Sequence, residues 1–134
     1  MQNEPTLSDA LNNSKTLAVV GLSDDNLRPS YMVAKYMQDH GYRIIPVNPK
    51  CDEILGEKCY PSLSAIPEPI DLVDVFRKPA DALVVAEEAI AIGAKTLWLQ
   101  IGVVNEEAKK LAEAAGITVI MDRCIKIEHA RLMP

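Results

Sequence analysis

The fold is decided by the stretch Thr16-Leu-Ala-Val-Val-Gly21 and the loop after it, Leu22-Ser-Asp-Asp-Asn-Leu-Arg-Pro-Ser30. The aliphatic and β-branched run predicts a buried strand, and the small polar residues and proline after it predict a turn and a helix start. The first N–H groups of such a helix lack partners within it and carry the positive end of its dipole, so the junction favours a phosphate. Gly21 has no Cβ and would let a ligand approach the backbone closely. The alternative is a tight turn without a ligand.

The order of helix, glycine, one further residue and strand recurs three times along the chain, at Gly41, Gly93 and Gly116. Apolar strands that alternate with one-sided apolar helices are typical of a parallel sheet covered on both faces. We therefore predict an α/β fold of three layers, αβα, with a doubly wound parallel sheet of five strands. Strands are expected at residues 16–20, 43–47, 71–76, 95–99 and 118–120, and helices at 6–12, 31–40, 79–92 and after Asn105.

The expected strand order, numbered along the chain, is 3-2-1-4-5. A ligand would then lie in the crevice at the carboxyl ends of the strands, where the order reverses beside the first strand. At 134 residues the chain fits a single domain, expected to span residues 1–134.

Composition argues against several classes of function. The net charge of −5 disfavours nucleic acid, and no apolar run approaches the ~20 residues that span a bilayer, so neither a nucleic-acid nor a membrane partner is expected. The start, Met1-Gln-Asn-Glu-Pro5, lacks the features of a signal peptide, which predicts a cytoplasmic protein. Three cysteines without a C-x-x-C pair, and two histidines, predict neither a disulfide framework nor a metal site.

Five of the fourteen basic residues follow strands and therefore belong to the expected ligand edge. They are Arg28, Lys50, Arg77, Lys78 and Arg123. In an acidic protein such a cluster favours an anionic ligand. Two of the five are expected to be ordinary surface charges, with Lys78 the first candidate because it stands beside a helix start.

The ligand edge does not fit a typical NAD site. The first turn offers only Gly21-Leu-Ser23 in place of Gly-x-Gly-x-x-Gly, and the second strand ends in Val47-Asn-Pro-Lys50 without an acid for the ribose hydroxyls. Lys50 suits a phosphorylated ribose, so NADP or a 3′-phosphoadenosine ligand such as coenzyme A remains.

Several motifs resemble those of the small stand-alone CoA-binding domain proteins, which are similar in fold to the CoA-binding domain of the succinyl-CoA synthetase α subunit. The resemblance covers nearly the whole chain, from about Leu11 to Leu132. Its motifs are Val20-Gly-Leu-Ser23, Arg28-Pro-Ser30, Pro46-Val-Asn-Pro49, Ile54-Leu-Gly56, Tyr60-Pro-Ser-Leu63, Phe76-Arg77, Gly93-Ala-Lys95, Gln100-Ile-Gly-Val103, Asn105-Glu-Glu107 and Asp122-Arg-Cys124.

The resemblance implies a Rossmann-like domain that binds coenzyme A. By analogy with the synthetase domain, the Gly21 loop would hold the phosphates and Lys50 would meet the adenosine end, while residues 76–77 and 100–102 would line the pocket. The full set of expected site residues is Gly21, Leu22, Ser23, Arg28, Ser30, Asn48, Pro49, Lys50, Phe76, Arg77, Lys78, Gln100, Ile101, Gly102, Arg123 and Cys124. Neither His40 nor His129 lies in a motif comparable to the synthetase phosphohistidine, so ligase activity does not follow.

The favoured interpretation is a CoA or acyl-CoA binding module without chemistry of its own. Alternatives are an oxidoreductase using NADP or NAD, and a nucleotide-sensing subunit that binds another protein. The sequence shows no evident catalytic constellation, because Ser23 has two acidic neighbours but no His or Lys as base. Cys124 stands beside a cation and would be either a reactive thiol or, as we favour, an inert one.

Overall fold

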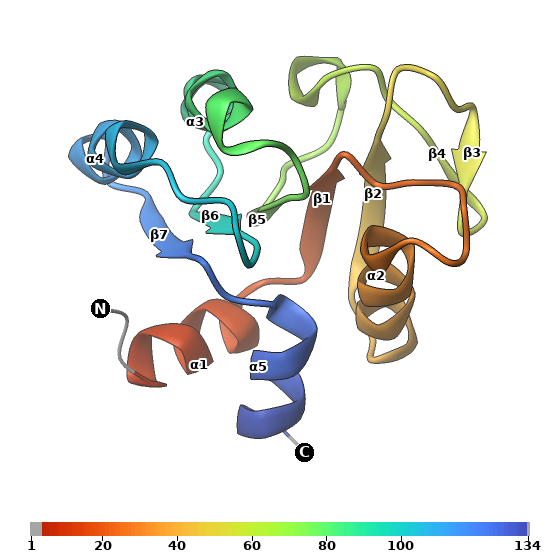
Figure 1. Cartoon of the computed structure of the whole chain (residues 1–134), viewed down its shortest axis with the longest axis horizontal. Helices are drawn as coiled ribbons and strands as arrows, with labels where there is room; N and C mark the ends of the chain where they lie inside the picture. The colour runs from red at the N-terminus through yellow and green to blue at the C-terminus, as the bar shows by residue number, and fades with distance from the viewer. Residues whose placement is uncertain (1–3, 134) are drawn as a thin grey trace.

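The strand predicted at the start of the chain, β1 (Thr16–Val20), lies inside a parallel sheet between β2 (Arg43–Val47) and β5 (Leu72–Val75). The sheet continues through β6 (Thr96–Leu99) to β7 (Thr118–Met121) at the far edge (Figure 1). This computed structural model describes residues 4–133. Residues 1–3, which begin the stretch without signal-peptide features, lie outside the described residues, as does residue 134. Both ends of the expected 1–134 domain are therefore not described.

Helices cover both faces of the sheet, as Figure 1 shows. One face carries α3 (Ala82–Ala91) and α4 (Glu106–Ala114), and the other carries α1 (Glu4–Asn13), α2 (Pro29–Asp39) and α5 (Ile125–Leu132). Successive strand side chains point to opposite faces, so Val73 and Val75 pack with α3 while Leu72 packs on the other side. The predicted Rossmann-like fold with three αβα layers is confirmed.

The predicted strand order is wrong in one respect. Numbered along the chain, the five strands run 2-1-3-4-5, because the third strand, β5, pairs with β1 instead of β2. Pro46 explains why β2 is an edge strand, since a proline has no N–H to donate to a further neighbour. The outer side of Pro46 is covered by Tyr60, whose N–H donates to the Pro46 carbonyl oxygen at 3.0 Å.

This order places the reversal between β1 and β5. The chain leaves β1 through α2 to reach β2 on one side, and then crosses to β5 on the other side. The crossing segment holds a small hairpin, β3 (Glu53–Ile54) with β4 (Glu57–Lys58), and the short helix η1 (Leu63–Ala65). In such a sheet the ligand crevice is expected at the carboxyl ends of the two strands that flank the reversal.

Two further features bear on the predictions from sequence. The helix after Asn105 is capped as expected, with the Ala108 N–H donating to Asn105 Oδ1 at 2.9 Å. The predicted helix at 79–92 divides into a short 3-10 turn, η2 (Pro79–Asp81), and α3. Within residues 4–133, none of the helices combines the length and apolar character that a membrane crossing requires.

Candidate functional site

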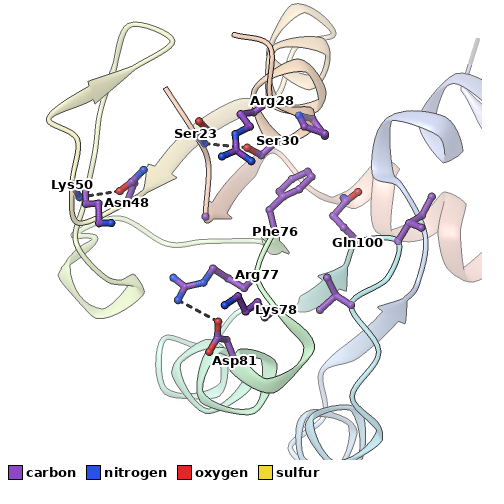
Figure 2. Close-up of a pocket in the computed structure, with 14 residues that line it drawn as sticks. Ser23, Arg28, Ser30, Asn48, Lys50, Phe76, Arg77, Lys78, Asp81 and Gln100 are labelled. Atoms are coloured by element: carbon purple, nitrogen blue, oxygen red, sulfur yellow. Dashed lines mark hydrogen bonds and ion pairs between the residues drawn. The ribbon is translucent and has the colours of Figure 1, made fainter. Parts of the chain in front are cut away.

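A cavity of about 820 Å³ opens at the carboxyl ends of β2, β1, β5 and β6, along the side of the sheet where the order reverses (Figure 2). Eleven of the expected site residues line it: Gly21, Ser23, Arg28, Ser30, Asn48, Lys50, Phe76, Arg77, Lys78, Gln100 and Ile101. In the sequence these residues belong to separate loops, and the parallel sheet brings the loops to one edge.

The loop after β1 is held by hydrogen bonds within itself and to the first turn of α2. The Ser23 N–H donates to Ser30 Oγ, the Asp25 N–H donates to Ser23 Oγ, and the Leu27 N–H donates to an Asp25 carboxylate oxygen, each at 3.0 Å. The Ser23 N–H is therefore already used by the Ser30 hydroxyl. Because both serine hydroxyls accept a backbone bond, their own protons are available to donate into the cavity.

The loop ends at the N-terminus of α2, where Arg28 is the N-cap and Pro29 the first helical residue. The Arg28 side chain makes no capping hydrogen bond. The first N–H groups of an α-helix have no partner within it, so this end of α2 presents donors and a positive dipole to the cavity wall.

Asn48 connects the loop after β1 to the turn after β2. Its amide nitrogen donates to the Leu22 carbonyl oxygen at 3.0 Å, and its amide oxygen accepts from the Lys50 N–H at 2.8 Å. Both polar ends of the side chain are thereby occupied by backbone. Asn48 lines the cavity, and these bonds fix where Lys50 leaves the turn.

Four cations line one part of the cavity. Arg28, Lys50 and Lys78 make no ion pair with any described residue, whereas Arg77 pairs with Asp81 at 3.3 Å. These residues follow β1, β2 and β5. Lys78, the first candidate for an ordinary surface charge in the sequence, lines the cavity. The three unpaired cations favour an anionic ligand at this end.

The part of the cavity beyond β6 carries no charge. It is formed by Gln100, Ile101 and Val103. Gln100 is nearly buried, and its amide nitrogen donates to the Asp74 carboxyl at 2.6 Å. Asp74 lies within β5, and its complete burial raises the pKa of that carboxyl to about 7, against a smaller opposing effect of the Gln100 hydrogen bond.

Comparison with known proteins decides the family. Residues 15–130 match the family model described as CoA binding domain. The chain belongs to this family. A protein of Bacillus subtilis, the uncharacterized YneT, is 52% identical over 132 residues, covering 97% of this chain and 98% of its own length.

Two further relatives differ in how much of their own length this chain covers. A hypothetical protein of Pyrococcus horikoshii has a solved structure with a TM-score of 0.96 and 41% identity, covering 99% of this chain and 94% of that one. An ADP-forming acetate–CoA ligase of Methanocaldococcus jannaschii is 28% identical over 126 residues. The match takes in 88% of this chain and only 18% of the ligase.

Five expected residues of this CoA binding domain are not on the cavity wall. Leu22 is fully buried in the layer of α2, and Pro49 and Gly102 lie in turns outside the wall. Arg123 pairs with Glu128 at 3.7 Å, and Cys124 is the N-cap of α5 and packs with that helix layer. The last two follow β7, the edge strand farthest from the reversal.

Sequence reasoning missed four residues at or behind the cavity. Pro29, Asp81 and Val103 line it, and Asp74 lies behind Gln100. A signal for Asp74 was present, because an acidic residue inside an otherwise apolar strand is rarely there for packing.

Proposed function

We propose that this CoA binding domain binds coenzyme A, or an acyl-CoA, along the carboxyl edge of its sheet, as a binding or regulatory module without chemistry of its own. The observation that carries the proposal is the division of the cavity into a cationic part and an uncharged part. Coenzyme A is divided in the same way, into an anionic 3′-phospho-ADP and an uncharged pantetheine arm.

The cationic part suits the phosphates. The N-terminus of α2, together with the Ser23 and Ser30 hydroxyls, offers donors to the diphosphate, and Arg28 offers charge. Lys50, which follows β2, would meet the 3′-phosphate of the ribose. Arg77 and Lys78 close the same part from β5.

The uncharged part suits the pantetheine arm. Ile101 and Val103 supply apolar contact, and Gln100 supplies one amide for hydrogen bonding. Ile101 is 62% exposed, so an arm lying there would lead its thiol or acyl group toward the mouth of the cavity. An acyl group would then be presented outside the domain.

A binding role is favoured over ligase chemistry by where the histidines lie. His40 and His129 pack against Tyr36, in the contact between α2 and α5, and neither belongs to the cavity wall. This chain matches only 18% of the ADP-forming acetate–CoA ligase. Ligase chemistry would therefore need parts of such a protein that the match does not include.

Ligand titrations test the proposal. At about a hundred times its dissociation constant, CoA is expected to stabilise the fold by roughly 2.7 kcal/mol, which raises the melting temperature by on the order of 5–15 °C. Calorimetry and thermal melts with CoA, acetyl-CoA, NADP and NAD would compare the candidates at equal concentration. A shift with NADP or NAD as large as that with CoA would favour the oxidoreductase alternative and overturn the proposal.

A further inference from the structure

Asp74 is an acid inside the apolar layer between the sheet and its helices. It is 1% exposed, and its register neighbours Val19 on β1 and Trp98 on β6 are fully buried. Its Oδ2 atom has no hydrogen-bond partner among the described residues. A buried polar atom without a partner costs stability, so packing does not explain why an acid occupies this position.

The other oxygen of Asp74 has one partner, and that partner lines the cavity. Gln100 Nε2 donates to Asp74 Oδ1 at 2.6 Å, and Gln100 is 5% exposed. Oδ1 can accept this bond whether or not Oδ2 carries a proton, because an unprotonated carboxyl oxygen has lone pairs only. Above about pH 7 the Asp74 carboxyl is ionised and has no proton to donate, so a reversed amide would set its oxygen against the carboxylate oxygens without a hydrogen bond.

We propose that Asp74 is a positioning residue that holds the nitrogen of the Gln100 amide, so that the amide oxygen faces the cavity and selects a ligand bearing a hydrogen-bond donor. In the ligand inferred above, that donor is an amide N–H of the pantetheine arm. The inference rests on the proposed binding of coenzyme A and assigns one specificity contact within it.

A Gln100 amide held in one orientation rejects ligand groups that a freely turning glutamine would accept. A freely turning amide can present either its oxygen or its NH2 group, and it loses rotamer freedom when a ligand binds. With the nitrogen held from behind, a ligand group lacking an N–H or O–H would leave the Gln100 oxygen desolvated and unpaired. Because Ile101 and Val103 are apolar, the Gln100 amide is the polar side chain of this part of the cavity.

The test compares two ligands on matched variants. Calorimetry would measure CoA and 3′-phospho-ADP, which lacks the pantetheine arm, on the parent, Asp74→Leu, Gln100→Met and the double variant. We expect Asp74→Leu to weaken CoA binding about three- to tenfold, the net value of one hydrogen bond, with no change for 3′-phospho-ADP. Gln100→Met should act alike, and the double variant no more strongly, because both changes remove one contact.

Asp74→Asn is the conservative control. Its amide oxygen can accept the same bond from Gln100, so it should keep the parent affinity for CoA. A second measurement needs no variant: the side-chain NH2 resonances of Gln100 in the parent should shift on adding CoA and stay in place with 3′-phospho-ADP.

The two proposals fail in different ways. If the parent binds CoA while Asp74→Leu binds it equally well, or loses both ligands to the same degree, Asp74 has no positioning role. Unmoved Gln100 resonances in CoA-saturated parent protein would also exclude that role, even if Asp74→Leu did not fold. A parent that binds neither CoA nor 3′-phospho-ADP would instead overturn the proposed function, and this inference with it.

Discussion

A Cβ atom placed on Gly21 would lie 2.2 Å from the carbonyl oxygen of Phe76, across the junction between β1 and β5. Gly21 has a φ of +84°, and its N–H donates to the Val47 carbonyl oxygen on β2 at 3.1 Å. Gly21, the residue directly after β1, therefore lies against the carboxyl ends of both neighbouring strands. The glycine is required by the protein's own backbone, in addition to any approach of a ligand.

Replacing Gly21 is accordingly expected to damage the fold before it reports on a ligand. Gly116 is a matched control, because its φ is +88° but nothing lies within 4 Å of its added Cβ. Gly116→Ala should cost about 1–2 kcal/mol through the left-handed backbone alone. Gly21→Ala should cost about 1–3 kcal/mol more through the clash. Urea denaturation of both variants would measure this, and equal losses would contradict the role of Phe76.

Lys50 offers a cleaner test of the cavity, because an exposed lysine without an ion pair contributes little to stability. If it faces the 3′-phosphate, the parent should prefer CoA to dephospho-CoA, and Lys50→Ala should reduce that preference by about tenfold at low salt. Lys95 precedes β6, at the amino ends of the strands, and serves as the control. Lys95→Ala should leave both affinities unchanged. Calorimetry with the two ligands measures the preference, and one that survives in Lys50→Ala would place the 3′-phosphate elsewhere.

The layers and strands could be predicted from sequence because each depends on a local pattern. Apolar runs and one-sided helices repeat along the chain, and the parallel sheet that they imply brings the loop residues to one edge. The strand order depends on pairing between distant segments, which periodicity does not encode. Pro46 nevertheless carried the missing information, since a proline inside a strand argues for an edge.

The candidate site was predictable to the extent that it follows from position after a strand. Gly21, Lys50 and Arg77 line the cavity for that reason. The same rule predicted Arg123 and Cys124 at the site, but both follow β7, the edge strand farthest from the reversal. Arg123 instead forms an ion pair with Glu128. Which cations remain free depends on side-chain pairs such as Arg77 with Asp81, and these form only in the folded chain.

His129 should titrate below its usual range. Burial, and less strongly the neighbouring His40, lower the pKa of His129 from 6.5, and its Nδ1 atom lies 2.9 Å from the Tyr36 hydroxyl. Since the folded state favours neutral His129, the stability it contributes is present above pH 6.5 and is lost as the pH falls below that value. NMR titration should show the His129 midpoint rising in His40→Gln, provided that the variant keeps the parent melting temperature. An unchanged or lower midpoint would remove His40 as a cause.

The effect of Asp74 on the free energy of unfolding should change with pH in the opposite direction to that of His129. Its pKa is raised from 3.8 to about 7 by burial, so the folded state holds a proton that the unfolded chain releases. Between those two values the folded state binds more protons, and the free energy of unfolding must therefore fall as the pH rises from about 4 to about 7. The slope is at most about 1.4 kcal/mol per pH unit. Asp74→Asn removes the titration and should gain stability relative to the parent over this range, with a constant difference above it. Urea denaturation of both proteins at a series of pH values measures the difference, and one that did not change between pH 4 and 7 would mean that Asp74 is ionised throughout.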